Sequence, residues 1–323
     1  SIAELCRRCV GIPILCVVGA LLIYAFCTVR FGKVIYDLLY STGDGLRSTP
    51  IDACAKYIVV FIIFGAFLER TGISAFFIDL ANMVAGASAG GPAKVAVISS
   101  ALCGMVSGSS VGNTVTTGSI TIPMMKKTGY SAEFAGAIEA VASTGGQFCP
   151  PVMGAVGFVM AEFLNISYTT VMIAALMPAL LYYLGLLCAV HFEARRLGMT
   201  GFSREHIPAV WAVVRARGHL VLPLVVLIAL MCLGYTPLYA AVIAIAVTVA
   251  ASWMKPETRM GWDAILAAVT EGARGAIAVG VCCVVIGVII GTVTLTSLGL
   301  NMGYLIMSVV EEGSIFLTGF LTM

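Results

Sequence analysis

The sequence predicts an all-α polytopic membrane protein, because of its composition, its long charge-free runs and two interruptions within those runs. Of 323 residues, 60% are apolar and 11% are charged, and the mean hydropathy is +1.04, whereas soluble domains are about 45–50% apolar. A single membrane helix needs only about 20 apolar residues, so several of the runs hold two crossings or a break. The runs without Asp, Glu, Lys or Arg are 9–29, 95–125, 140–161, 163–192, 218–254 and 275–310.

Composition also disfavours several classes of site. The 11 cysteines are scattered, mostly within apolar runs, and are expected to be small packing residues. Cys6 and Cys9 form a C-x-x-C pair, but no second pair or nearby histidine accompanies them, so a metal site is disfavoured there. The net charge of +2 gives no indication of nucleic-acid binding. The chain opens at Ser1 without a secretory leader and stops within an apolar segment, so we expect it to be a fragment of a longer protein.

The first part of the chain is expected to hold two spans and an amphipathic helix. Apolar stretches at 10–27 and 57–69 are interpreted as spans. Residues 71–86 keep apolar side chains at helical spacing, with Asp79 and Asn82 on one face. An interfacial helix with a wetted stripe therefore explains this segment better than a buried acid does.

A break is predicted inside the run 95–125, whose centre reads VSGSSVGNTVTTGS. As one straight helix, these 31 residues would be about 46 Å long, well beyond a hydrocarbon core of about 30 Å. Glycines and hydroxyl residues between Gly104 and Gly118 mark the interruption. Because each remaining half is too short to cross alone, we expect a re-entrant helical hairpin.

The segment 131–165 repeats this pattern, with STGGQFCPP between two apolar helices. The glycines can end the first helix in left-handed geometry. Pro150 and Pro151 lack amide hydrogens and suit the start of the second helix. Non-helical backbone at membrane depth survives only where it lines a protein-buried or watered cavity. This discontinuous helix and the hairpin therefore indicate a polar site between the two breaks.

The rest of the chain is expected to hold a span at 169–190, a basic loop and a two-span hairpin. The loop at 191–218 is rich in arginine and fits a cytoplasmic, positive-inside loop. A histidine metal site is disfavoured because the three histidines lie at least 13 residues apart. The run 218–254 breaks at GYTP, residues 234–237.

An internal repeat is indicated by two glycine-bounded segments. Residues 298–313 echo residues 71–86 at an offset of 227, with Gly299 and Gly313 matching Gly72 and Gly86. Transporters are often built from inverted repeats. If the repeat holds, the counterpart of the first hairpin begins beyond residue 323, so the second hairpin is expected to be absent from this chain.

The two breaks offer ligands of opposite character. Unwound backbone and helix C-termini present carbonyl oxygens, which with hydroxyls suit a hard monovalent cation such as sodium. Half-helix N-termini present amides and a partial positive charge that favour a carboxylate. The alternative, that small and hydroxyl residues only let membrane helices approach closely, is disfavoured for two clusters flanking one helix. Glu139 and Glu162 are either proton carriers or end-of-helix residues, and the second interpretation is preferred.

Four stretches carry a resemblance to a known family. They are GGPAKVAV, VSGSSVGNTVTTGSITIPMMKKTGY, AGAIEAVASTGGQFCPPVMGA and AEFLNISY. They resemble the large permease subunit of tripartite ATP-independent periplasmic (TRAP) transporters, DctM-type, and most of all the fused TAXI branch. The resemblance is close over residues 50–200 and looser elsewhere.

The resemblance implies an inverted-repeat, elevator-type transporter in a bacterial or archaeal cytoplasmic (inner) membrane. It would be a sodium-coupled symporter that imports small organic acids, of the carboxylate or dicarboxylate class, from an extracytoplasmic solute-binding protein. A small membrane subunit, fused upstream in this branch, is a further expected partner. Coupling sodium is implied near Ser107, Ser110, Gly145, Phe148 and Pro150, the last three through backbone carbonyls. Asn113, Thr114 and Gln147 are implied substrate contacts.

These inferences give a provisional domain organisation. An N-terminal span and linker occupy 1–50, scaffold or arm helices 51–90, the transport-domain hairpin and discontinuous helix 91–168, scaffold spans 169–260, and a truncated second repeat 261–323.

Two other functions remain to be separated from this one. A divalent-anion and sodium symporter could share the hairpin architecture without a binding protein. An intramembrane enzyme with Ser109 or Ser110 as nucleophile is disfavoured, because that chemistry needs a base within hydrogen-bond reach and every histidine lies in 191–219. The chain is therefore expected not to be an enzyme. The charge-free hairpin leaves the particular substrate open.

Overall fold

Helices make up all the regular structure in the described part of the chain. The computed structural model describes residues 2–41, 45–199, 210–301 and 303–304. No strand occurs within those ranges, which confirms the predicted all-α class. The chain divides into two compact units, residues 1–55 with 277–323, and residues 56–276.

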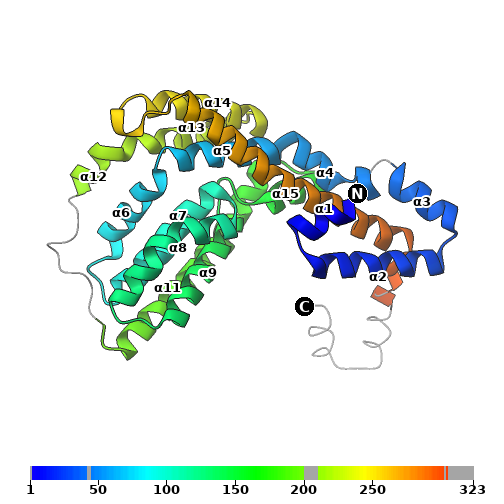
Figure 1. Cartoon of the computed structure of the whole chain (residues 1–323), viewed down its shortest axis with the longest axis horizontal. Coiled ribbons are helices and arrows are strands. Elements are labelled where there is room, and N and C mark those ends of the chain that lie inside the picture. Colours follow the sequence, from blue (N-terminus) through cyan, green and yellow to red (C-terminus); the bar gives the residue numbers. More distant parts are fainter. Residues whose placement is uncertain (1, 42–44, 200–209, 302, 305–323) are drawn as a thin grey trace. The chain divides into compact units, whose positions relative to one another are not determined.

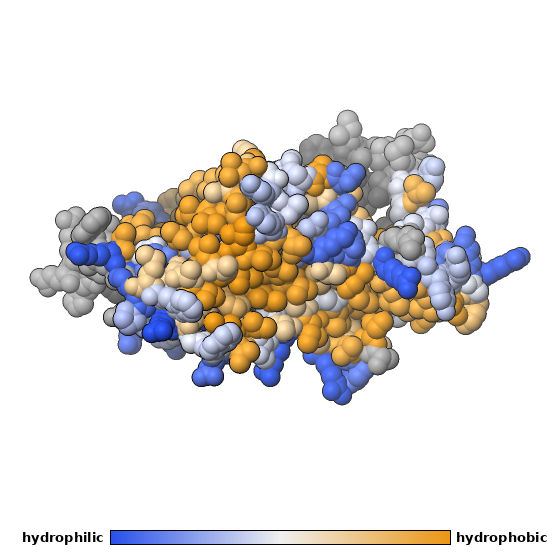
Figure 2. Space-filling view, turned by 90° about the horizontal axis from the view of Figure 1, so that it is seen from above, coloured by the Kyte–Doolittle hydropathy of each residue, from blue (hydrophilic) through white to orange (hydrophobic). Residues whose placement is uncertain are grey.

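Three continuous helical stretches are long and apolar enough to cross a membrane: Thr49–Arg70, Tyr168–Arg196 and Trp262–Leu295. Large apolar side chains also lie on the surface. On the second of these stretches, Met177 is 70% exposed and Leu180 is 63% exposed. Figure 2 shows hydrophobic residues spread over much of the face it presents. Such a surface suits lipid rather than water, and the chain is a multi-pass membrane protein.

The first unit is built on N-terminal helices and the C-terminal part of a long helix. It holds α1 (Ile2–Cys9), α2 (Ile12–Thr28), α3 (Phe31–Leu39), α4 (Thr49–Ala53) and the part of α15 (Trp262–Leu295) from residue 277. Helix α2 covers most of the predicted first span, but its 17 residues leave it outside the three stretches that are long enough to cross a membrane. Cys6 is buried with Val18 and Val285, so it is a packing residue, as predicted.

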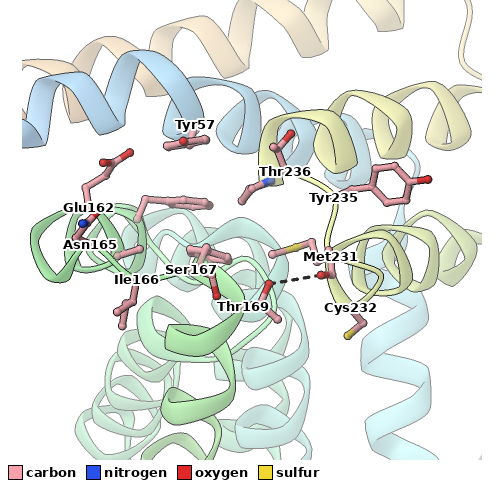
Figure 3. Close-up of a pocket in the computed structure, with 15 residues that line it drawn as sticks. Tyr57, Glu162, Asn165, Ile166, Ser167, Thr169, Met231, Cys232, Tyr235 and Thr236 are labelled. Atoms are coloured by element: carbon pink, nitrogen blue, oxygen red, sulfur yellow. Dashed lines mark hydrogen bonds between the residues drawn. The ribbon is translucent and has the colours of Figure 1, made fainter.

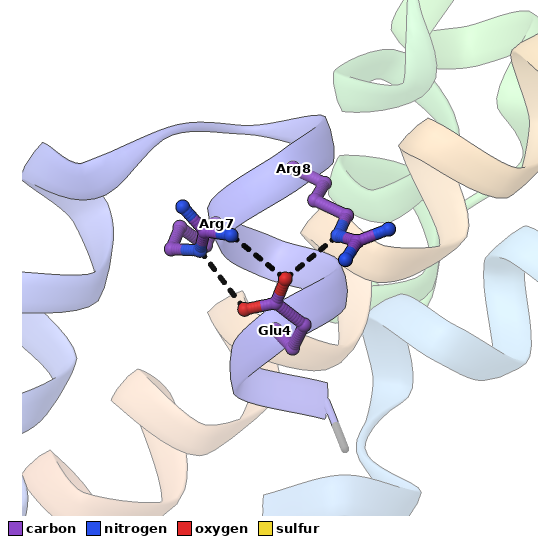
Figure 4. A network of polar contacts seen from close by, with 3 residues as sticks. All are labelled: Glu4, Arg7 and Arg8. Carbon is purple, nitrogen blue, oxygen red and sulfur yellow. Dashed lines mark hydrogen bonds and ion pairs between the residues drawn. The ribbon is translucent and has the colours of Figure 1, made fainter.

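On the solvent side of α1, one carboxylate bridges two guanidinium groups. Glu4 accepts hydrogen bonds from Arg7 at 2.8 Å and from Arg8 at 2.7 Å (Figure 4). Arg7 and Arg8 hold the pKa of Glu4 below its usual range. All three side chains are solvent-exposed, so these pairs add little to stability.

The second unit contains the predicted hairpin and the discontinuous helix. In it, α7, α8, α9 and α11 pack against one another (Figure 1). Hydroxyl N-caps begin several of the helices, since Ser109, Ser131 and Ser167 each accept from a backbone amide of the first turn. Its helices are α5 (Val59–Arg70), α6 (Ile73–Ala85), α7 (Gly91–Ser107), α8 (Ser110–Lys127), α9 (Ala132–Gly145), α10 (Ala155–Leu164), α11 (Tyr168–Arg196), α12 (Val210–Arg217), α13 (Leu222–Cys232), α14 (Pro237–Ser252) and the first part of α15.

The predicted hairpin is confirmed. Helices α7 and α8 have 17 and 18 residues, or about 26 and 27 Å, and neither reaches the roughly 30 Å of a hydrocarbon core. Gly108 reverses the chain with a left-handed φ of 62°. Ser109 then caps α8 by accepting from the Gly112 amide at 3.2 Å. The polar tip therefore follows from a glycine turn and a serine cap.

The discontinuous helix is also confirmed, although its break differs in detail from the prediction. Helix α9 passes into a 3₁₀ turn, and Gly146 has a right-handed φ of −60°. The expected left-handed glycine end is therefore wrong. Pro150 and Pro151, joined by a cis peptide bond, do not start the next helix, which begins at Ala155. The intervening chain is held by hydrogen bonds instead, including Gly154 N to Gln147 O at 2.6 Å.

Small residues let the helices beside the break pack closely. Ala93, Ala96, Ala135 and Ala142 are buried between α7, α9 and α11. Tyr183 of α11 closes this cluster and donates a hydrogen bond to Ala142 O at 3.1 Å. Close backbone approach through small side chains is the usual way in which membrane helices pack tightly.

Asp79 of α6 is 41% exposed and lies 4.0 Å from Arg217 of α12, so a buried acid is excluded. The interfacial position of α6 stays a prediction. Helices α13 and α14 form a hairpin at the predicted turn, where Gly234 has a φ of 88°, but neither helix is among the three stretches that are long enough to cross a membrane. Residues 200–209 of the basic loop and 305–313 of the proposed repeat lie outside the described residues.

Candidate functional site

The two helix breaks meet in the structure. The side-chain amide of Gln147, in the 3₁₀ turn after α9, donates to Ser110 Oγ at the start of α8 over 2.9 Å. The backbone amide of Val152 donates to Met105 O, in the last turn of α7, over 3.3 Å. The hairpin tip and the unwound segment therefore form one continuous polar region, as the sequence predicted.

Glycines let the backbone of the hairpin tip contact the backbone of the unwound segment directly. A methyl group added to Gly146 would lie 2.5 Å from the Cα of Gly104, and one added to Gly108 would lie 2.2 Å from Met153 O. Both distances are well inside van der Waals contact. No larger residue fits at these positions unless the hairpin and the unwound segment move apart.

Four half-helix ends face this region. Helices α7 and α9 end here at Ser107 and Gly145, and α8 and α10 begin here at Ser110 and Ala155. Neither C-terminus has a basic residue in its last turn, and neither N-terminus has an acidic residue in its first turn. The partial negative charge of the C-termini and the partial positive charge of the N-termini are therefore not neutralised by neighbouring side chains.

Backbone carbonyls in the unwound segment differ in what they bond to. The Tyr168 hydroxyl donates to Pro151 O at 3.0 Å and to Val152 O at 2.5 Å. Among the described residues, no hydrogen-bond donor reaches the carbonyl oxygens of Phe148 and Pro150. Pro151 has no amide hydrogen, which removes one local donor.

The implied sodium ligands cluster around this contact. Ser107 ends α7 and Ser110 opens α8, and both side chains are half-buried. Gly145 is buried, and a methyl group added there would lie 2.7 Å from Tyr183 Oη. The Phe148 ring packs edge-on against Tyr182 at 5.1 Å between ring centres, which fixes the turn that follows Gly145.

The three implied substrate residues differ in how far they are buried. Gln147 is exposed, and Thr114 is half-buried with its hydroxyl donating to Ser110 O at 2.8 Å. Asn113 is only 1% exposed. Its Nδ2 donates into the hairpin, to Ser100 O at 2.8 Å and to Ser100 Oγ at 3.0 Å, so in this structure it supports the tip from within.

Glu139 differs from its prediction as an end-of-helix residue. That interpretation is wrong, because Glu139 lies in the middle of α9 and is 0% exposed. Hydroxyl groups from α7, α8 and α9 surround its carboxyl group. Thr117 and Thr121, one helical turn apart on α8, were the signal available in the sequence. Glu162, in contrast, lies in the last turn of α10, as an end-of-helix residue should.

Two cavities lie near the discontinuous helix. An apolar one of about 370 Å³ is bordered by Gln147, Phe148 and Met153, beside the break. The other, of about 510 Å³, lies between the α10–α11 turn and the α13–α14 turn, and Thr169 Oγ1 donates to Met231 O there over 3.5 Å (Figure 3). Only the first cavity is lined by residues of the break.

A multi-pass helical protein with a polar centre built from broken helices has the architecture of a membrane permease. Similarity to known proteins agrees with this class. The chain belongs to the family described as the tripartite ATP-independent periplasmic transporter, DctM component, which it matches over residues 2–323. This confirms the family that the sequence motifs indicated.

Individual relatives are similar to this chain at modest identity. The C4-dicarboxylate TRAP transporter large permease protein DctM of Pseudomonas aeruginosa is 30% identical over 215 residues, 64% of this chain and 50% of that protein. The protein of the same name in Vibrio cholerae is 30% identical over 195 residues, covering 58% and 43%. The isethionate TRAP transporter permease protein DctMQ of Oleidesulfovibrio alaskensis is 29% identical over 224 residues, covering 68% and 34%.

The chain thus spans between a third and a half of the length of these curated relatives. The relatives are transporter permeases, which confirms the prediction that the chain is not an enzyme and removes the intramembrane serine nucleophile from consideration.

Proposed function

We propose that this chain forms part of the permease of a sodium-coupled secondary transporter that imports small organic acids across the cytoplasmic membrane. An extracytoplasmic solute-binding protein delivers the acid, and a small membrane subunit completes the complex. The observation that carries the proposal is the meeting of two helix C-termini and two helix N-termini at one pair of breaks. This arrangement offers a cation site and a carboxylate site side by side.

In this proposal, sodium is bound on the side of the helix C-termini. The carbonyl oxygens of Phe148 and Pro150 and that of Gly145 supply oxygen ligands, and the hydroxyls of Ser107 and Ser110 complete the set. Oxygen atoms of this kind are the ligands that a hard cation prefers. The substrate carboxylate meets the N-termini of α8 and α10, where no acidic side chain opposes it. Thr114 and Gln147 line that side.

Coupling follows from the shared position of the two sites. Ser110 belongs to the hairpin tip, and its hydroxyl accepts from Gln147 of the unwound segment. A cation that draws the tip and this segment together also fixes the N-termini that bind the carboxylate. Sodium and acid therefore bind cooperatively, and the loaded transport domain moves as one body in an elevator-type step.

Uptake into liposomes by the full-length permease with its binding protein tests this function. A panel of organic acids is supplied with and without an inward sodium gradient. The proposal predicts uptake of one or more small carboxylates that collapses when sodium is replaced by potassium. Uptake that ignores the sodium gradient would contradict it. Sodium-driven uptake without any binding protein would favour a divalent-anion symporter instead.

A further inference from the structure

Glu139 is enclosed by hydroxyl groups deep inside the hairpin. Ser100 of α7 donates to its Oε1 at 3.0 Å, and Ser143 of α9 donates to the same oxygen at 3.2 Å. From α8, Thr117 donates to Oε1 and Thr121 donates to Oε2 at 2.5 Å. The side chain of Glu139 is 0% exposed, and Gly118 leaves room for it, since a methyl group there would lie 3.0 Å from its Cγ.

No cation compensates this carboxyl group within the described residues. Lys94 and Cys103 on α7, Lys126 and Lys127 on α8, and Glu133 on α9 are the titratable groups of the three enclosing helices, and none is ion-paired or hydrogen-bonded to Glu139 in the described structure. A buried carboxylate is expensive without a cationic partner, and ionisable residues buried within membrane proteins mark functional sites.

The surrounding hydroxyls have alternative acceptors, so the cluster can satisfy a carboxyl group with or without a proton. Thr117 Oγ1 lies 2.7 Å from Asn113 O, and Thr121 Oγ1 lies 3.0 Å from Thr117 O. Each hydroxyl has one hydrogen to donate. With Glu139 ionised, the threonines donate to the carboxylate. With Glu139 protonated, its O–H donates to Thr121 Oγ1, which turns its own hydrogen to Thr117 O.

The cluster is connected to the hairpin tip. Ser100 contacts Glu139 and also accepts from Asn113 Nδ2 through its Oγ and its carbonyl oxygen. Asn113 Oδ1 is buried and has no hydrogen-bond partner among the described residues. A methyl group on Gly104 would lie 3.0 Å from Asn113 Nδ2 and 2.7 Å from the Cα of Gly146. A packed path therefore leads from the carboxyl group to the break.

We propose that Glu139 is a proton-binding site built into the hairpin. It takes up and releases one proton while its heavy-atom neighbours stay in place, and the hydroxyl rearrangement reaches the break through Ser100 and Asn113. This role goes beyond the proposed transport function and does not require the sodium site to be correct.

Infrared difference spectroscopy on the purified full-length permease in lipid tests the proposal, with pH as the only variable. The carbonyl stretch of a protonated carboxyl group in an apolar site is resolved from that of a carboxylate. Wild type is expected to show such a band that grows as the pH falls and that Glu139→Gln lacks. A Glu139-dependent band that stays constant with pH, or the absence of any such band, would overturn the proposal.

A second pair of variants keeps the carboxyl group and is informative even if Glu139→Gln fails to fold. Thr121→Val removes a hydrogen bond from both forms of Glu139, but the bond to the charged carboxylate is the stronger of the two, so the midpoint of the band's pH dependence should rise by about one pH unit. Thr116→Val is the matched control, because its hydroxyl donates to Gly112 O at 2.9 Å and does not touch Glu139. Equal midpoints in these two variants would also overturn the proposal. Neither measurement depends on transport.

Discussion

The Gln147 side-chain amide and the Ser110 hydroxyl are 2.9 Å apart and join the two helix breaks. Gln147 belongs to the turn after α9, and Ser110 is the first residue of α8. They are 37 residues apart in the chain, and each marks a place where the membrane helix pattern fails. This hydrogen bond is a direct contact between the hairpin tip and the unwound segment.

Removing the hydrogen bond between Gln147 and Ser110 is expected to lower the affinity for substrate more than it lowers the maximal transport rate. Gln147→Ala should raise the substrate concentration for half-maximal uptake by about 2- to 10-fold, because a typical net hydrogen bond contributes about 0.5–1.5 kcal/mol. Thr144→Ala is the control, since its exposed hydroxyl donates only to Ala140 O. Concentration series of uptake into liposomes measure both variants. Equal values for the two would show that the bond has no part in binding.

The contact between Gly104 and Gly146 predicts that Gly146→Ala lowers the stability of the protein, whereas Gly136→Ala does not. Gly146→Ala forces a methyl group to 2.5 Å from the Cα of Gly104, and overpacking of this kind costs about 1–3 kcal/mol. Gly136→Ala, in α9, meets no atom within 4 Å and should be neutral or stabilising, because alanine favours helix. Thermal unfolding in detergent should therefore give a lower Tm for the first variant only. A wild-type Tm for Gly146→Ala would contradict the close approach.

Gly108 has a left-handed backbone and also packs against another backbone segment. Comparison with Gly72, which has only the left-handed backbone, separates these two constraints. Both have a left-handed φ, of 62° and 80°, but only Gly108 lies against backbone, with Met153 O 2.2 Å from an added methyl group. Gly72→Ala should cost only the left-handed strain of about 1–2 kcal/mol. Gly108→Ala should lower the Tm further. If both variants unfold at the same temperature, the tip does not press against residue 153.

Tyr168 supports the unwound segment by hydrogen bonding to two carbonyl oxygens. Tyr168→Phe keeps the ring that stacks on Phe158 at 4.1 Å, but it leaves both buried oxygens without this donor, at a cost of about 1–3 kcal/mol. Tyr182→Phe is the matched control, because its more exposed hydroxyl donates to one oxygen, Val141 O. We expect the Tm of Tyr168→Phe to fall below that of Tyr182→Phe, and the reverse order would refute this role.

Much of the architecture could be predicted from the sequence because length arithmetic is strict in a membrane. The charge-free run 95–125 was too long for one span, and the structure turns it at Gly108. The positions of the breaks and the α13–α14 hairpin were predicted from run length and from glycine and proline positions. The exposure of Asp79 was predicted from the helical spacing of apolar residues. The family could be identified because four stretches of the sequence resemble its members, and the family matches residues 2–323.

The internal arrangement of the site could not be predicted in the same way. Periodicity places a residue on a helix face, but it does not say which neighbour that face meets. Glu139 therefore looked like the end of a charge-free run, although three helices enclose it. Asn113 looked like a tip residue, although its amide turns inward to Ser100. The glycines near 145 were expected to end a helix, whereas they allow contact with Gly104.

The sodium dependence of uptake by Ser110→Ala shows whether the two breaks hold the coupling cation. The full-length permease, reconstituted with its binding protein, is assayed over a range of sodium concentrations at saturating substrate. Loss of an oxygen ligand should raise the sodium concentration for half-maximal uptake by about fivefold or more. Ser119→Ala, an exposed hydroxyl on the same helix that donates to Thr116 O, should match wild type. A Ser110→Ala permease with unchanged sodium dependence would contradict the site at the two breaks.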